Sequence, residues 1–186
     1  MNGRQQSNAA ERQLWLFALI CTGMILLGSA MGACSAGITD GGTVRNLLSG
    51  MDSYGIDSSS DIFRNVCPIV LTAVFGLTLF GKFLIPVIGL LRGFLAGYSI
   101  SAIMRSVAEH GFLYALERDG AVLFVTVPFF LSVSVIAMRT SSQISAGVRS
   151  GGRNLRPSVR LSEYILLMTI LLIIPCILMM ILRIMF

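Results

Sequence analysis

The chain alternates long apolar segments with shorter polar ones, a pattern typical of a protein that crosses a membrane several times. A helix needs about 20 consecutive apolar residues to span the hydrocarbon core of a bilayer, because each residue adds only about 1.5 Å to its length. Five segments approach or exceed this length, the second being the shortest: Leu14–Cys34, Val66–Gly81, Phe83–Met104, Ala121–Met138 and Tyr164–Ile184. We therefore predict an all-α polytopic membrane protein, folded as a single domain over residues 1–186.

The arginines set the predicted orientation, because cytoplasmic loops carry an excess of lysine and arginine. The polar loop 139–163 holds five arginines, whereas the outer loop 35–65 is rich in glycine, serine and aspartate. We predict that the N-terminus is cytoplasmic and that the C-terminus lies on the outer side, that is, N-in and C-out. A rival division of the chain into spans makes Val66–Leu91 one long span and Gly93–Met104 a re-entrant segment. It places loop 139–163 and its five arginines on the outer side, against the preference of arginine for cytoplasmic loops.

Local signals predict how the second span begins and ends. Asp61 is a preferred N-cap residue and is expected to open the helix that leads into the span. The Gly81-Lys82 junction is expected to turn the chain tightly into the third span, so that the two form an antiparallel hairpin. The outer loop is expected to hold a short amphipathic helix over residues 44–51.

The composition supports a membrane protein and argues against nucleic-acid binding. Hydrophobic residues make up 55% of the 186-residue chain and charged residues only 12%, whereas charged residues are about a quarter of an ordinary soluble domain. The net charge of +5 is not a nucleic-acid signal, because the arginines are dispersed between apolar segments without aromatic interleaving. No nucleic-acid partner is therefore expected.

The residues that usually carry metal or catalytic chemistry are sparse. Three of the four cysteines fall inside predicted spans, namely Cys21, Cys67 and Cys176. No two cysteines of the chain are spaced as CxxC. Cys34 lies at the outer end of the first span, and His110 is the single histidine. His110 has Glu109 and Glu117 nearby in sequence, but no nucleophile motif accompanies them. We expect no catalytic residue, no metal site and no cofactor, and hence no enzyme.

Two sets of glycines recur at helical spacing inside predicted spans. Gly89, Gly93 and Gly97 stand at i, i+4 and i+8 in the third span, and Gly28 and Gly32 stand four residues apart in the first. Small residues on one stripe let two membrane helices approach closely and gain dispersion and Cα–H···O contacts. We expect these glycines to pack helices within one subunit, with homo-oligomerisation or docking of a partner as the alternatives.

Arg92 is a charge near the middle of the third span, where a charged side chain is costly and usually faces the protein interior, a partner or water. No Asp or Glu lies inside any predicted span. We therefore expect Arg92 to bond to backbone carbonyls near the prolines of the spans or to lipid phosphate. The lack of an intramembrane carboxylate also argues against a proton-coupled transporter.

The order of several segments resembles the stage II sporulation protein M family of endospore-forming bacteria over nearly the whole chain. The matching segments are Asp61–Asn65, Leu90–Tyr98, Gly111–Leu116 and Val127–Ser132. The most specific pieces are the Arg92-Gly93 pair followed by Gly97, and Pro128 in the fourth span.

The resemblance implies a non-enzymatic, multi-pass scaffold of the cell membrane at the sporulation septum. It would hold two extracytoplasmic peptidoglycan-degrading enzymes, stage II sporulation proteins P and D, during septal thinning and engulfment. The residues leave open a second function, a small transporter or permease component in which Arg92 contacts an anionic substrate near the bilayer midplane.

Overall fold

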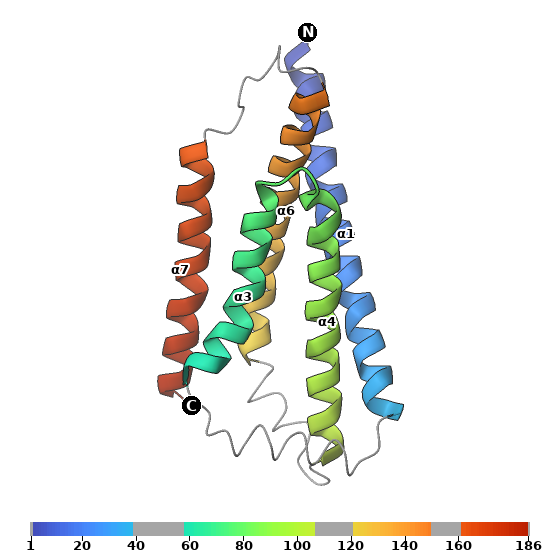
Figure 1. The fold of residues 1–186 in the computed structure, drawn as a ribbon, viewed down its shortest axis with the longest axis vertical. Helices are drawn as coiled ribbons and strands as arrows, with labels where there is room; N and C mark the ends of the chain where they lie inside the picture. The colour runs from blue at the N-terminus through green and yellow to red at the C-terminus, as the bar shows by residue number, and fades with distance from the viewer. Residues whose placement is uncertain (1, 39–57, 107–120, 150–160, 186) are drawn as a thin grey trace.

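The computed structural model describes residues 2–38, 58–106, 121–149 and 161–185. These residues form five α-helices and no β-strand, so the all-α prediction is confirmed for the described part of the chain. The helices are α1 (Asn2–Ile38), α3 (Ser58–Gly76), α4 (Gly81–Ser106), α6 (Ala121–Arg149) and α7 (Leu161–Met185). Successive helices run in opposite directions along one bundle axis, so that α1 and α4 run the same way (Figure 1).

Three of these helices are long and apolar enough to cross a membrane. Their apolar stretches are Glu11–Ile38 in α1, Gly81–Ala102 in α4 and Leu123–Val148 in α6. The apolar parts described in α3 and α7 are shorter, Asn65–Gly76 and Glu163–Leu178. The structure is therefore consistent with a membrane protein that has at least these three candidate spans.

The helix ends differ from the predicted ones, because hydropathy marks the apolar part of a helix and not its hydrogen-bonded length. α6 runs to Arg149, eleven residues beyond the predicted end of its span at Met138. α3 begins at Ser58, so Asp61 lies inside the helix and the prediction of Asp61 as the N-cap was wrong. The predicted helix over residues 44–51 lies outside the described residues.

The turn between the second and third spans also lies elsewhere than predicted. α3 ends at Gly76 and α4 begins at Gly81, so residues 77–80 make the turn and the expected Gly81-Lys82 junction belongs to the helix. This break contradicts the rival division, which needs one continuous span over Val66–Leu91. The turn was missed because three of its four residues, Leu77, Leu79 and Phe80, are apolar and give no turn signal.

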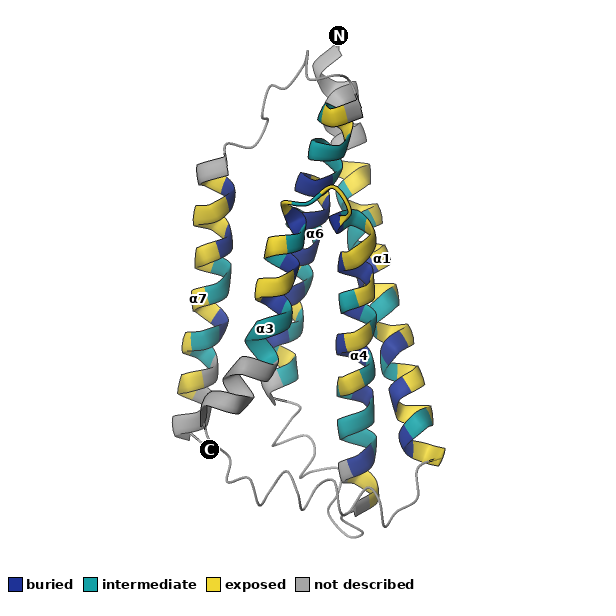
Figure 2. Ribbon diagram, viewed as in Figure 1, coloured by how far each residue is buried: buried dark blue, intermediate teal, exposed yellow. Residues whose placement is uncertain are grey.

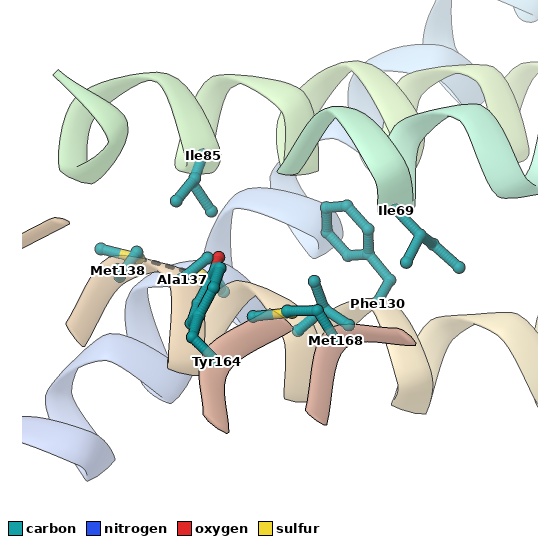
Figure 3. Close-up of a cluster of buried hydrophobic side chains, with 9 residues drawn as sticks. Ile69, Ile85, Phe130, Ala137, Met138, Tyr164 and Met168 are labelled. Atoms are coloured by element: carbon teal, nitrogen blue, oxygen red, sulfur yellow. Dashed lines mark hydrogen bonds between the residues drawn. The ribbon is translucent and has the colours of Figure 1, made fainter. Parts of the chain in front are cut away.

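α6 is the central element of the bundle, since it packs against each of the other four described helices. α1 lies beside α4, and α7 packs on α3 and α6. Buried side chains from all five helices meet in one core, shown in part in Figure 3: Cys21, Ile69, Ile85, Phe130, Val133, Ala137, Met138, Tyr164 and Met168. The Tyr164 hydroxyl on α7 also donates a hydrogen bond of 2.8 Å to the Ala73 carbonyl on α3.

The outward faces of the helices are apolar. Figure 2 shows this pattern plainly for α7, whose exposed positions lie on the side away from the other helices and whose buried positions face them. Many of the exposed residues are large hydrophobic ones, including Trp15, Leu19, Leu26, Phe83 and Phe124. An apolar surface of this extent is unfavourable in water and is the surface that lipid chains cover in a membrane.

Ser141 of α6 fixes the turn between α3 and α4. Its Oγ donates a hydrogen bond of 2.8 Å to the Thr78 carbonyl and accepts one of 3.0 Å from the Lys82 backbone N–H. The side chain is fully buried. A single hydroxyl therefore satisfies one backbone group on each side of the turn and ties both to the central helix.

Replacing Ser141 by alanine leaves the Thr78 carbonyl and the Lys82 N–H without this partner. We predict a loss of about 1–3 kcal/mol in the free energy of unfolding, measured by thermal or denaturant unfolding in detergent, because unsatisfied buried polar groups are costly. The matched control is Ser142→Ala, a half-buried neighbour, which should change stability by no more than about 0.5 kcal/mol. Equal effects of the two substitutions would contradict the role given to Ser141.

Candidate functional site

The glycines of α1 meet the backbone of α4 directly. A Cβ atom built on Gly28 would collide with the Leu90 carbonyl oxygen, and one built on Gly32 would collide with the Phe94 carbonyl oxygen. No side chain fits between the two backbones at these positions. The close approach therefore depends on glycine.

The glycines of α4 meet α1 in the same way. A Cβ atom on Gly93 would strike the Ile25 carbonyl oxygen, and one on Gly97 would strike the Ser29 carbonyl oxygen. Each glycine stripe thus faces carbonyls of the opposite helix, and the paired positions advance together along two parallel helices. This geometry brings Cα–H groups close to carbonyl oxygens over about two turns of each helix.

Gly89 does not share this constraint. The nearest atoms to a Cβ there would be Ile25 Cγ1 and Phe130 Cε1, each at 3.6 Å, which is ordinary van der Waals contact. Of the five glycines singled out in the sequence, the structure therefore places four in the tight contact and Gly89 at its edge. What the spacing did not indicate is that the two stripes face each other.

Arg105 closes the far end of the α1–α4 contact. Its Nη1 donates hydrogen bonds of 3.0 Å to the Ala36 carbonyl and 2.8 Å to the Gly37 carbonyl. These carbonyls belong to the last turn of α1, where no intrahelical partner is available and where a positive charge is favoured by the helix dipole. Sequence reasoning did not single out Arg105, and its position in the last turn of α4 carries no signal for a cap on another helix.

The tight contact predicts that Gly93→Ala destabilises the protein by about 1–3 kcal/mol, because the added methyl group forces the α1 and α4 backbones apart. Gly89→Ala is the matched control in the same helix. It has room for the methyl group and should be neutral or stabilising by up to about 1 kcal/mol, since alanine favours a helix over glycine. Thermal unfolding of the two variants in one detergent would measure the difference, and similar melting temperatures would contradict the predicted collision.

Arg92 lies on a different face of α4 from the glycine contact and points to α3 and α6. It is only 7% exposed. Its Nη1 donates a hydrogen bond of 3.1 Å to the Asn65 carbonyl on α3, and its guanidinium carbon lies 5.0 Å from the centroid of the Phe130 ring on α6. The observed acceptor is thus a backbone carbonyl three residues before Pro68, of the kind expected from the sequence.

The remaining polar atoms of Arg92 are not matched by the protein. Nε and Nη2 are buried and have no hydrogen-bond partner among the described residues, and the same holds for Thr126 Oγ1 and Ser134 Oγ. Thr126 and Ser134 lie one helical turn before and after Phe130, on the same face of α6. Unsatisfied buried groups cost about 1–3 kcal/mol each, and more when they are charged, so Arg92 is the costliest of these three residues to bury.

The other residues considered for chemistry are not brought together. The Cys21 thiol is buried and lies 3.4 Å from Met138 Sδ, Cys34 is exposed, and Cys67 and Cys176 are half-buried. The described residues contain no group of three or more histidine, cysteine or acidic side chains that could hold a metal ion. His110, Glu109 and Glu117 lie outside the described residues.

No protein-family model, no curated protein and no solved structure matches this chain. Within the described residues, the fold and the site define the class of the protein, an all-α bundle with three helices long and apolar enough to cross a membrane, a glycine-mediated helix pair and one buried arginine.

Proposed function

We propose that this protein is a non-enzymatic membrane scaffold whose five helices all cross the bilayer, with the N-terminus inside and the C-terminus outside. At about 1.5 Å per residue, the 19 residues of α3 and the 25 residues of α7 extend about 28 and 37 Å, which suits a hydrocarbon core of about 30 Å. The start of α4, with Lys82, and the end of α6, with Arg149, lie at the same end of the bundle as the N-terminus (Figure 1). This arrangement fits a cytoplasmic face rich in basic residues.

The single observation that carries the scaffold proposal is the backbone contact between α1 and α4. Four glycines hold these helices so closely that their relative position has little freedom. A helix pair of this kind fixes the ends of α1 and α4 relative to each other, and fixed attachment points are what an anchor for other proteins requires. The resemblance to the stage II sporulation protein M family gives the proposal its specific form, an anchor for stage II sporulation proteins P and D at the septum.

The proposed orientation predicts opposite behaviour for fusions at the two ends of the intact chain. Alkaline phosphatase fused after Phe186 should be active, because this enzyme folds outside the cytoplasm, and green fluorescent protein fused before Met1 should fluoresce. Swapping the two reporters is the control and should silence both. An active fluorescent protein at the C-terminus, with inactive phosphatase there, would mean that the orientation or the number of spans is different.

The scaffold proposal predicts that the full-length protein, extracted in mild detergent, co-purifies with a peptidoglycan-degrading enzyme from sporulating cells. Gly93→Ala should reduce this recovery several-fold because it separates α1 from α4, whereas Gly89→Ala should leave it unchanged. A fluorescent fusion should gather at the sporulation septum. Normal septal thinning and engulfment in a deletion strain, together with no recovered hydrolase, would show the proposal to be wrong.

One observation favours the second candidate function, a small transporter or permease component. Arg92 keeps Nε and Nη2 buried and without a partner among the described residues, as a group that contacts an anionic substrate would.

A further inference from the structure

The glycine contact fixes the height of α4 relative to α1. The carbonyls that Gly28 and Gly93 face place Gly93 beside residues 25–28 of α1, and the two helices run in the same direction (Figure 1). Lys82 precedes Gly93 by eleven residues in α4, and the same number of residues back along α1 leads to Leu14–Phe17. Lys82 is therefore level with the start of the apolar part of α1.

A second exposed cation, Arg139 of α6, lies at the same level. The Lys82 backbone N–H donates its hydrogen bond of 3.0 Å to Ser141 Oγ, and Arg139 comes two residues before Ser141, about 3 Å along the helix. Pro128, Ser132 and Arg139 are all exposed, and their spacings of four and seven residues put them on one side of α6. Arg139 therefore faces away from the bundle, on the side that lipid covers.

The Lys82 side chain also points outward. Its Nζ lies 5.0 Å from the centroid of the Phe83 ring, and Phe83 is one of the exposed large hydrophobic residues. Trp15, in the segment of α1 level with Lys82, is exposed as well. A tryptophan at the level of outward-facing cations is typical of the headgroup region of a membrane. We call Trp15, Lys82 and Arg139 the interfacial belt.

The length of α4 agrees with a membrane surface at the belt. Arg105 follows Lys82 by 23 residues, about 34 Å along the helix, which is slightly more than a hydrocarbon core of about 30 Å. Both cations of α4 thus reach opposite surfaces.

The cations of the belt lack a counter-charge in the described part of the chain. The acidic residues described at this end of the bundle are Glu11 and Glu163, both exposed. Neither Lys82 nor Arg139 forms an ion pair with a described residue. A cation that faces lipid is costly unless an anion or water meets it.

We propose that the interfacial belt binds anionic phospholipids, and that Lys82 and Arg139 each donate hydrogen bonds to the phosphate of a lipid of their own. A headgroup with a net negative charge is favoured over a zwitterionic one, because no cation of the lipid competes for its phosphate. The inference rests on the membrane-spanning arrangement proposed above, but not on the scaffold role.

The depth of the belt can be measured on the unaltered protein, because Trp15 is the only tryptophan of the chain. In vesicles, lipids brominated close to the headgroup should quench its fluorescence more than lipids brominated near the chain end. Stronger quenching by the deeper bromines would place Trp15 away from the surface and overturn the belt. Quenching by aqueous iodide without quenching by either lipid would instead contradict the spanning arrangement itself.

Lipid binding is tested by thermal unfolding of the full-length protein in a maltoside detergent, with phosphatidylglycerol or phosphatidylcholine added at equal mole fraction. Phosphatidylglycerol should raise the melting temperature by about 3 °C or more above phosphatidylcholine, since a ligand that binds the folded state stabilises it. The double variant Lys82→Gln, Arg139→Gln should lose most of this difference. The charge-preserving variant Lys82→Arg, Arg139→Lys should keep it.

A matched variant separates the belt from the total charge of the protein. Arg4→Gln with Arg12→Gln removes the same charge from the part of α1 that precedes the belt, and should keep the larger part of the difference between the two lipids. An equal loss in this variant would mean that the lipid responds to net charge and that the belt is not a site. Equal melting temperatures of the wild type in the two lipids would also overturn the proposal, even if quenching places Trp15 at the surface.

Discussion

The close approach of the α1 and α4 backbones is the constraint on which the rest of the bundle depends. Lipid chains are as apolar as leucine, so two membrane helices gain little from burying apolar side chains against each other, and contact must come from close packing and weak hydrogen bonds. Gly28, Gly32, Gly93 and Gly97 meet this requirement by placing carbonyl oxygens of one helix over glycines of the other. The fixed pair then determines which face of α4 remains for the other helices.

That remaining face carries Arg92. Because Gly93 and Gly97 hold one side of α4 against α1, Arg92 is turned toward α3 and α6, away from lipid. Snorkelling of its side chain to a membrane surface is ruled out by its burial and its hydrogen bond to Asn65. The same contact that packs the bundle therefore places a charge inside it, and the charge must be balanced by whatever α3 and α6 provide.

The sequence predicted the features that depend on residue type and missed those that depend on the backbone. Apolar length gave the five helices, and glycine spacing indicated the packing stripes. The turn at residues 77–80 was predicted a few residues too late, at Gly81-Lys82, and the hydroxyl that fixes it could not be foreseen, because Ser141 lies 63 residues away from Thr78 in the sequence. The carbonyl that Arg92 contacts could not be predicted either, because every residue has a backbone carbonyl and the sequence does not show which of them is accessible to a side chain. The choice of Asp61 as N-cap failed because residue preference does not fix a helix end to within three residues.

α6 connects these features, and this connection explains why the buried polar atoms gather where they do. It touches all four other described helices, so its inner face cannot be lipid-exposed anywhere along Thr126, Phe130, Ser134 and Ser141. At Ser141 the hydroxyl is matched on both sides by backbone groups of the turn. At Thr126 and Ser134 no such match occurs among the described residues, although the burial is the same. Burial on the inner face of α6 therefore does not by itself give a hydroxyl a partner; of these three side chains, Ser141 has two because the neighbouring turn brings a carbonyl and an N–H within hydrogen-bond distance.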